Sequence, residues 1–259
     1  MLIFITSIRH PLNCRSFDNV NNLLQYTLKS VYAQNIQSFQ VIVVCNKESR
    51  LTRHQQAHYI EVDFPAPSTL HRPDTGMAAI QLDRGTKYAA GLLFARELNP
   101  TYIMFFDADD LVSRNMTKYV ESSPICAGWY FERGYRFRMG DSCVTPVNSF
   151  YKHCGTSHIF NFHNFSLPTD ITHNSGQQEI LTAFGESYVK SILGSHRLAN
   201  KLHAMNGNVL VPFPFFGAVW VLGHGENHSG KTGKAGTLCI DNNMQAEFSF
   251  PQAYMSLEN

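Results

Sequence analysis

The sequence lacks several features that mark particular classes of protein. It holds six cysteines but no Cys-x-x-Cys pair, a spacing that predicts neither a zinc site nor a dense disulfide framework. No apolar run reaches about 18 residues, so no transmembrane helix is predicted. The apolar start at residues 2–5 is too short for the core of a signal peptide and has no basic residues before it. We therefore expect a cytoplasmic protein with free thiols and no transmembrane segment.

The charge of the chain is also nearly balanced. Its 21 basic and 20 acidic residues give a net charge of +1, so no broad charged surface is expected and nucleic acid is not a predicted partner. Any attraction for phosphate must be local. We find no internal repeat and no linker that divides the chain, and 44% hydrophobic residues are enough for a sizeable core. The sequence therefore predicts one domain over residues 1–259.

Apolar runs alternate with helical patterns in the first half. Strands are predicted at residues 2–8, 39–44, 59–64 and 102–106, with helices at 18–33 and 87–98. This alternation is typical of parallel strands joined by right-handed crossovers, in an α/β fold. Such sheets bind their ligands beyond the carboxyl ends of the strands.

The second half is less regular. Residues 129–138 are aromatic and basic, which favours strands or a hairpin. Residues 144–173 have weak periodicity and are interpreted as a binding loop or lid. Residues 179–205 have a helical pattern that is interrupted near Gly194, and residues 209–222 are apolar.

The most informative segment is the predicted strand that ends in an acidic cluster. Four apolar residues at 103–106 lead into Asp107, Asp109 and Asp110. Residues i and i+2 of an extended chain point the same way, so Asp107 and Asp109 can face one ligand. Carboxylates this close repel one another unless a cation or hydrogen-bond donors neutralise them, and hard divalent cations suit such oxygens.

Two other interpretations of this cluster stay open. It can be a solvated turn after a strand. It can also be the nucleophile motif of haloacid-dehalogenase phosphatases, in which Asp107 would form an aspartyl-phosphate. That motif usually begins its fold and carries Thr or Val two residues after the second Asp, where this chain has Leu111.

Three motifs in order along the chain resemble the GT-A glycosyltransferases of the family 2 type. Residues 83–110 resemble the nucleotide-sugar half of these enzymes and end in the Asp-x-Asp motif. Residues 3–9 resemble their first strand, and Leu-x-Ser-x-x-x-Gln at 28–34 matches their first helix end. His-x-x-Asn-x-Ser at 224–229 matches their C-terminal signature.

The resemblance implies a fold and an activity. The fold is a GT-A, Rossmann-like three-layer α/β/α sandwich with a mostly parallel central sheet. Within the single domain, residues 1–112 would bind the nucleotide sugar and residues 113–259 the acceptor. The activity is that of a metal-dependent, hexosyltransferase-like enzyme that moves a sugar from a UDP- or GDP-sugar to a hydroxyl of a carbohydrate or other acceptor. Inversion at the anomeric carbon and a role in surface polysaccharide or glycan synthesis are also implied.

The same resemblance assigns a metal site. Asp107 and Asp109 would hold Mn²⁺ or Mg²⁺ against the diphosphate, with Asp107 also near the ribose. His224 would add a ligand, since a neutral imidazole fits Mn²⁺ tolerably. His228 competes with His224 for this role, and a histidine without function in a glycine-rich surface loop is the alternative.

Basic residues are predicted to bind the donor. Arg84 and Lys87 precede the acidic strand, where the family carries a basic residue that reaches the donor. Arg9 and Thr6, at the end of the first strand, are also assigned to donor binding. A basic charge beside a diphosphate is physically sensible, although solvated helix charges would give the same pattern.

The chain departs from the family at two places. Cys45 and Asn46 stand where the family carries acidic residues, one of which holds the nucleobase. His196 stands where the family carries an acidic general base, and its usual pKa suits proton abstraction near neutrality. Glu186 and Asp170 are alternative bases. These departures leave a non-catalytic relative that binds sugars or nucleotides as an alternative.

Overall fold

The computed structural model describes residues 1–70, 74–227 and 233–255, and its main feature is a seven-stranded sheet. Its strands are β1 (Leu2–Ser7), β2 (Phe39–Asn46), β3 (Ala57–Val62), β4 (Tyr102–Phe105), β6 (Gly128–Tyr130), β9 (His158–Asn161) and β10 (Val211–Pro212). They lie in the order β10-β6-β9-β4-β1-β2-β3. β3, β2, β1 and β4 run parallel, whereas β9 is antiparallel to both of its neighbours, β4 and β6. The predicted, mostly parallel sheet is confirmed.

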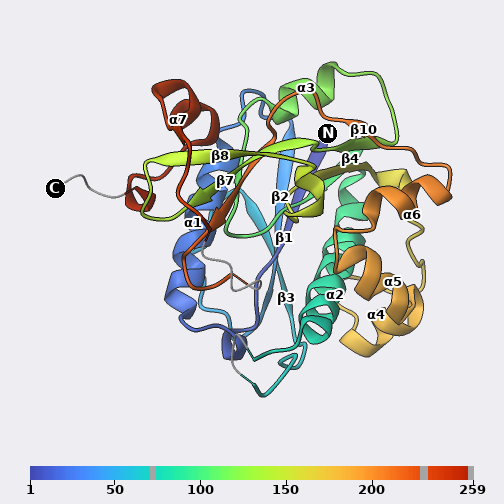
Figure 1. Cartoon of the computed structure of the whole chain (residues 1–259). Coiled ribbons are helices and arrows are strands. Elements are labelled where there is room, and N and C mark those ends of the chain that lie inside the picture. Colours follow the sequence, from blue (N-terminus) through green and yellow to red (C-terminus); the bar gives the residue numbers. More distant parts are fainter. Residues whose placement is uncertain (71–73, 228–232, 256–259) are drawn as a thin grey trace.

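Two long helices cover opposite faces of this sheet, α1 (Phe17–Tyr32) and α2 (Met77–Ala95) (Figure 1). Side chains of β1 alternate between the two faces. Leu2 and Phe4 belong to the apolar cluster that includes α1, whereas Ile3 and Ile5 belong to the cluster that includes α2. The result is the predicted three-layer GT-A arrangement, in which β1 is buried on both faces.

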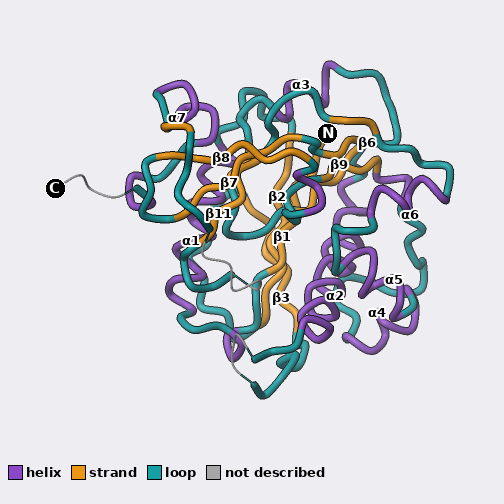
Figure 2. Tube along the Cα trace, in the orientation of Figure 1, coloured by secondary structure: helices purple, strands orange, loops and turns teal. Residues whose placement is uncertain are grey.

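A second, smaller sheet is built mostly from the second half of the chain (Figure 2). Its strands are β5 (Leu111–Val112), β7 (Arg133–Arg138), β8 (Cys143–Asn148), β11 (Ala218–Leu222) and β12 (Leu238–Cys239), in the order β12-β8-β7-β11-β5. The shorter helices are α3 (Met116–Ser122), α4 (Gln177–Phe184), α5 (Glu186–Tyr188), α6 (Ala199–Met205) and α7 (Asn242–Phe248). Since β5 begins directly after the acidic cluster, this cluster connects the two sheets.

The elements of the first half lie where the sequence predicts them, with one difference. The predicted helix at 87–98 begins at Met77 instead. Its additional turns carry Gly85, where a Cβ would lie 2.1 Å from the carbonyl oxygen of Val189 in the π-helical turn η5 (Val189–Leu193). The early turns of α2 are therefore set by close packing against η5, which an apolar period in the sequence does not reveal.

The second half corrects one prediction and refines two others. Residues 144–173 are not simply a loop or lid, because they contain most of β8 and all of β9, whose Ile159 is fully buried in the centre of the main sheet. Residues 129–138 form strands, as predicted, but not the alternative hairpin, because β6 and β7 belong to different sheets. The interruption predicted near Gly194 is present between η5 and α6, and a Cβ at Gly194 would lie 2.1 Å from the carbonyl of Gln81; the part before it is further divided into α4, α5 and η5. In each case the long-range partner decides the local structure.

All six cysteines are free in the structure. Cys143 and Cys239 lie opposite each other on β8 and β12, with their Sγ atoms 3.0 Å apart. Among the helices of residues 1–70, 74–227 and 233–255, none is long and apolar enough to cross a membrane.

Candidate active site

A cavity of about 280 Å³ lies beyond the carboxyl ends of β1 and β4. Its lining combines Arg9 after β1, Arg84 on α2 and the acidic cluster after β4 with His196 and Trp220 from the second half. The cavity therefore lies where open α/β sheets hold ligands. It also joins the two halves that the sequence assigns to donor and acceptor.

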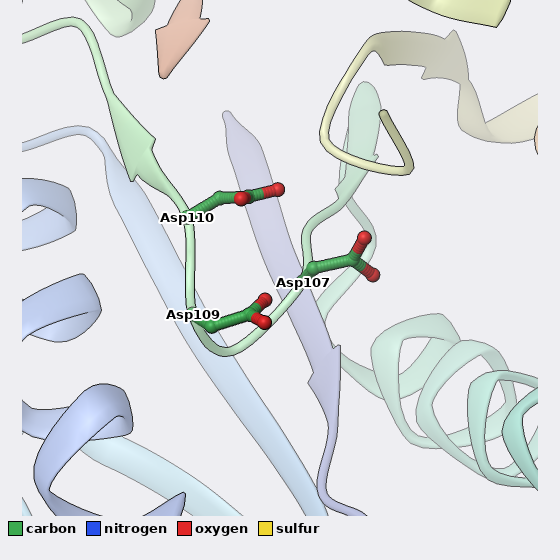
Figure 3. Close-up of side chains that lie close together, drawn as sticks. All are labelled: Asp107, Asp109 and Asp110. Atoms are coloured by element: carbon green, nitrogen blue, oxygen red, sulfur yellow. The ribbon is translucent and has the colours of Figure 1, made fainter. Parts of the chain in front are cut away.

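Asp107, Asp109 and Asp110 form the acidic turn that follows β4 (Figure 3). One oxygen of each lies within 4.8 Å of one oxygen of the others, which is close enough for a shared cation. Asp107 and Asp109 line the cavity, whereas Asp110 does not. The three carboxylates have different partners, and the partners define what each can do.

Asp107 pairs with Arg84, whose Nη2 donates to Oδ1. Burial raises the pKa of Asp107, although Arg84 opposes this shift. Burial also acts to lower the pKa of Arg84, but Asp107, Tyr88 and Asp109 together outweigh it and the pKa is raised, so the guanidinium keeps its charge. Gly155 packs against the pair, and a Cβ there would lie 2.4 Å from Arg84 Nη2 and 2.5 Å from Asp107 Oδ2. The glycine therefore leaves room for the ion pair.

Asp109 pairs with His224, whose Nε2 lies 2.9 Å from Oδ2. His224 Nδ1 accepts a hydrogen bond from the Glu226 backbone N–H at 3.1 Å, which assigns the ring proton to Nε2. Asn227 Nδ2 lies 2.8 Å from the same Nε2. Burial acts to raise the pKa of Asp109, but the hydrogen bond and charge of His224 and the charge of Arg9 together outweigh it, and the pKa is lowered. Asp109 is therefore ionised at neutral pH.

Asp110 is buried, and both of its oxygens accept hydrogen bonds from the chain. Oδ1 accepts from the Val221 N–H at 3.0 Å, and Oδ2 accepts from Thr156 at 2.6 Å and from Cys154 at 3.0 Å. Burial and the two neighbouring carboxylates raise its pKa well above the usual range. Asp110 thus ties the acidic turn to β11 and to residues 154–156, which makes it a positioning residue.

The C-terminal signature packs against the start of the chain through Glu226. Its Oε2 accepts from Arg9 Nη1 at 3.0 Å, and its Oε1 accepts from the backbone N–H groups of Arg15 and Ser16, just before α1. Burial lowers the pKa of Arg9, an effect that Glu226 opposes. This contact brings His224 within reach of Asp109. The last residue of the predicted signature, Ser229, and the competing ligand His228 lie outside the described residues.

His196, the predicted general base, lines the cavity next to Arg84. Burial, together with the charge of Arg84, lowers its pKa to about 3, so the ring is neutral at physiological pH. Its Nε2 is buried and has no hydrogen-bond partner among the described residues. The alternative bases Glu186 and Asp170 are exposed and lie outside the cavity lining.

The structure brings together most, but not all, of the predicted site residues. The cavity is lined by Arg9, Arg84, Asp107, Asp109 and His196. His224 does not line it, but its Nε2 lies 2.9 Å from Asp109 Oδ2.

Thr6 and Lys87 do not line the cavity. Thr6 is fully buried in β1. Lys87 is also fully buried, and its Nζ donates to the carbonyl of Ile8 and to Asp83 Oδ2, both at 2.8 Å. Any effect of Lys87 on a ligand in the cavity therefore passes through these two partners.

Four other residues that line the cavity are not predicted as site residues from the sequence: Asn13, Asp83, Trp220 and Glu226. The i,i+4 spacing of Asp83 and Lys87 on a helix is a signal for their ion pair. Glu226 lies inside the signature but at a variable position. Asn46, considered for contact with the base, is buried outside the lining and donates to the Phe64 carbonyl at 2.9 Å.

The donor set of the acidic turn fits Mg²⁺ or Mn²⁺. Asp107 and Asp109 present carboxylate oxygens to the cavity, and hard divalent cations prefer oxygen ligands. The nitrogen of His224 that faces Asp109 is Nε2, which carries the ring proton here, so His224 could ligate a cation only after that proton has moved to Nδ1. Asp110 fits less well, because its oxygens are already occupied.

The chain belongs to glycosyl transferase family 2. The model of that family matches residues 17–176, which is more than half of the 259 residues. The matched region includes α1, α2, β4 and the acidic turn. The predicted family is therefore confirmed. No curated protein sequence matches the chain.

Several solved structures are similar to this chain. Residues 1–349 of TarS from S. aureus are 12% identical, with 85% of this chain and 60% of that chain covered and a TM-score of 0.46. A structure of the same TarS fragment in complex with UDP-GlcNAc is 9% identical, with 89% and 61% covered and a TM-score of 0.45. The 4-diphosphocytidyl-2C-methyl-D-erythritol synthase from Anaerococcus prevotii is 12% identical, with 84% and 87% covered and a TM-score of 0.41. The chain thus spans about 60% of the TarS fragment.

Proposed function

We propose that this chain transfers a sugar from a nucleoside diphosphate sugar, with UDP or GDP as the nucleotide, to a hydroxyl of a carbohydrate or other acceptor. The observation that carries the proposal is the cavity shared by Asp107 and Asp109, by Arg9 and Arg84, and by His196. The two carboxylates can hold a cation, the two arginines can neutralise phosphate, and His196 can accept a proton. Membership of glycosyl transferase family 2 supports the same reaction class.

The donor diphosphate binds between the acidic turn and the two arginines. Asp107, Asp109 and His224 would hold Mn²⁺ or Mg²⁺, which when bound neutralises the charge that grows on the leaving diphosphate. Arg84 keeps its charge at neutral pH. When its bond to Asp107 is broken, it forms charge-assisted hydrogen bonds to phosphate oxygens instead. Arg9 is held at the cavity by Glu226 and adds a second positive charge.

His196 receives the proton of the acceptor hydroxyl. The ring is neutral at neutral pH and bonds to the backbone of Lys152, whereas its Nε2 has no partner within the described part of the chain, so Nε2 is the nitrogen that can accept a hydrogen bond. A pKa of about 3 makes it a weak base, so its main contribution is to orient the hydroxyl before the leaving group departs. In-line attack of this hydroxyl inverts the anomeric carbon. Residues 1–112 then bind the donor and residues 113–259 the acceptor.

The phosphatase alternative is not supported by the family match. A phosphatase of that type would use Asp107 as a nucleophile, yet Asp107 Oδ1 accepts a hydrogen bond from Arg84. The non-catalytic alternative predicts nucleotide binding without turnover.

A melting-temperature screen tests the proposal. The purified chain is heated with UDP, GDP, ADP or CDP, each with and without Mn²⁺ or Mg²⁺. A metal-dependent rise with UDP or GDP is expected, because a ligand that binds only the folded state stabilises it. Release of the free diphosphate from the corresponding sugar nucleotide then measures turnover. No shift with any nucleotide contradicts the proposal, and a shift without turnover in any acceptor mixture supports the non-catalytic relative.

A further inference from the structure

Asp83 is a buried carboxylate on α2 with one satisfied oxygen and one free oxygen. Its Oδ2 accepts from Lys87 Nζ at 2.8 Å, and Lys87 also donates to the carbonyl of Ile8. Oδ1 is buried and has no partner among the described residues, and Asp83 lines the cavity. The charge of Lys87 thus stabilises the buried carboxylate of Asp83, but it leaves one oxygen of that carboxylate available to a ligand.

Asn13, at the end of the turn η1 (Pro11–Asn13), presents a second free oxygen. Its Nδ2 donates to the carbonyls of Ser68 and Leu70 at 2.8 Å and 3.0 Å. Since a carbonyl accepts only from the amide nitrogen, these bonds fix the orientation of the side chain. Its Oδ1 is buried and without a partner in the described ranges, and Asn13 also lines the cavity.

Both free atoms are acceptors, and this restricts the ligand. A buried acceptor without a donor is costly, so the two oxygens favour a ligand that brings N–H or O–H groups. Phosphate oxygens cannot supply them at neutral pH. The cavity lining also includes Ile8, Pro67 and Ile80, whose apolar surfaces suit the flat face of a nucleobase.

We propose that Asp83 and Asn13 select the nucleoside of the donor by accepting hydrogen bonds from an N–H of its base or an O–H of its ribose. The inference rests on the proposed sugar-nucleotide function. It moves base selection from the strand end at Cys45 and Asn46, which lies outside the lining, to η1 and α2. A base edge that offers only lone pairs to these oxygens is excluded.

Edited nucleotides test this without any change to the protein. Calorimetric titration with Mg²⁺ compares UDP with N3-methyl-UDP and 2′-deoxy-UDP, and GDP with N1-methyl-GDP. Removing the donor group that Asp83 or Asn13 binds is expected to weaken binding at least about 10-fold. The methylated arms report the base N–H and the deoxy arm reports the ribose. Equal affinity within both series overturns this inference but leaves the proposed function intact. No binding by any of these nucleotides overturns both.

A variant then assigns the effect to the residue. Asp83→Asn can still accept from Lys87 through its oxygen, and it places an N–H₂ donor where Oδ1 stood. The variant should bind the unmodified nucleotide at least about 10-fold more weakly and lose the discrimination between unmodified and edited nucleotides. Asp63→Asn, at an exposed carboxylate outside the lining, is the matched control and should keep this discrimination. Discrimination that survives in Asp83→Asn contradicts the role of Asp83, and the wild-type titrations stand if this variant does not fold.

Discussion

The acidic turn and the Asn13/Asp83 pair line the same cavity but are prepared for ligands in opposite ways. At the acidic turn, Asp107 already has Arg84 and Asp109 already has His224. At the pair, one oxygen of Asp83 and one of Asn13 have no donor within the described residues.

This difference determines how much free energy a ligand gains at the acidic turn and at the Asn13/Asp83 pair. A cation or diphosphate at the acidic turn must replace contacts that the protein makes with itself. A donor group that reaches the Asn13/Asp83 pair breaks no contact within the described part of the protein, and it meets acceptors whose desolvation otherwise costs about 1–3 kcal/mol each. Selectivity is therefore expected from the pair, and dependence on metal and charge from the turn.

Replacing Asp109 by Ala should have the largest effect. It removes a carboxylate that faces the cavity, so metal-stimulated transfer or donor hydrolysis should fall by on the order of 10²–10³-fold or more. The melting temperature of the Asp109→Ala variant, measured by circular dichroism, should stay close to that of the wild type. Full activity in this variant would contradict the proposed role of the acidic turn in holding a cation.

Replacing Asp110 by Ala should instead weaken the fold. The donors of Thr156, Cys154 and Val221 lose their buried partner, and we expect the free energy of unfolding to fall by about 3 kcal/mol. Urea denaturation measures this. A stability loss no greater than that of Asp109→Ala would contradict the different roles of these neighbouring carboxylates.

Acid should destabilise the fold through a buried histidine of the second half. Burial lowers the pKa of His158 to about 3, so below its unfolded pKa of about 6.5 the unfolded chain binds more protons. Stability is therefore retained above pH 6.5 and falls from there towards pH 3, by about 2 kcal/mol at pH 5 for His158 alone. The lowered pKa of Asp109 acts only below about pH 4. Urea denaturation at pH 7.5, 6 and 5 gives the slope, and His158→Gln should reduce it; an unchanged slope contradicts the assignment.

The smallest effect is expected at the surface. Lys47 and Asp63 form an ion pair whose side chains are 57% and 72% exposed. Asp63→Asn should change the free energy of unfolding by no more than about 0.5 kcal/mol. A larger loss in urea denaturation would show that exposed charges matter more here than the buried contacts of Asp110 suggest.

Sequence predicts the parts of the site that follow from local pattern. The buried strand before Asp107 and the i,i+2 spacing to Asp109 place both at the carboxyl end of the sheet, and the structure has them there. Local pattern does not reveal the role of Asp110, because its oxygen Oδ1 accepts from the N–H of Val221, 111 residues away. It cannot show that Lys87 is buried either, since the carbonyl of Ile8 is one of its two partners.

The same limit applies to the fold of the second half. Residues 158–161 show no clear strand period because both faces of β9 are buried, with Ile159 in one apolar cluster and Phe160 in the other. A period of two marks a strand only when one of its faces meets water.

The contact between Arg9 and Glu226 also has a consequence for biosynthesis. The two residues are 217 positions apart, so the ribosome makes almost all of the described chain before they can meet. Until then the start of α1 lacks its carboxylate, and Asp109 lacks His224. The parallel strands of the first half can form earlier, but the cavity matures last. A nascent chain halted before residue 224 should therefore fold much of its sheet and still lack a complete active site.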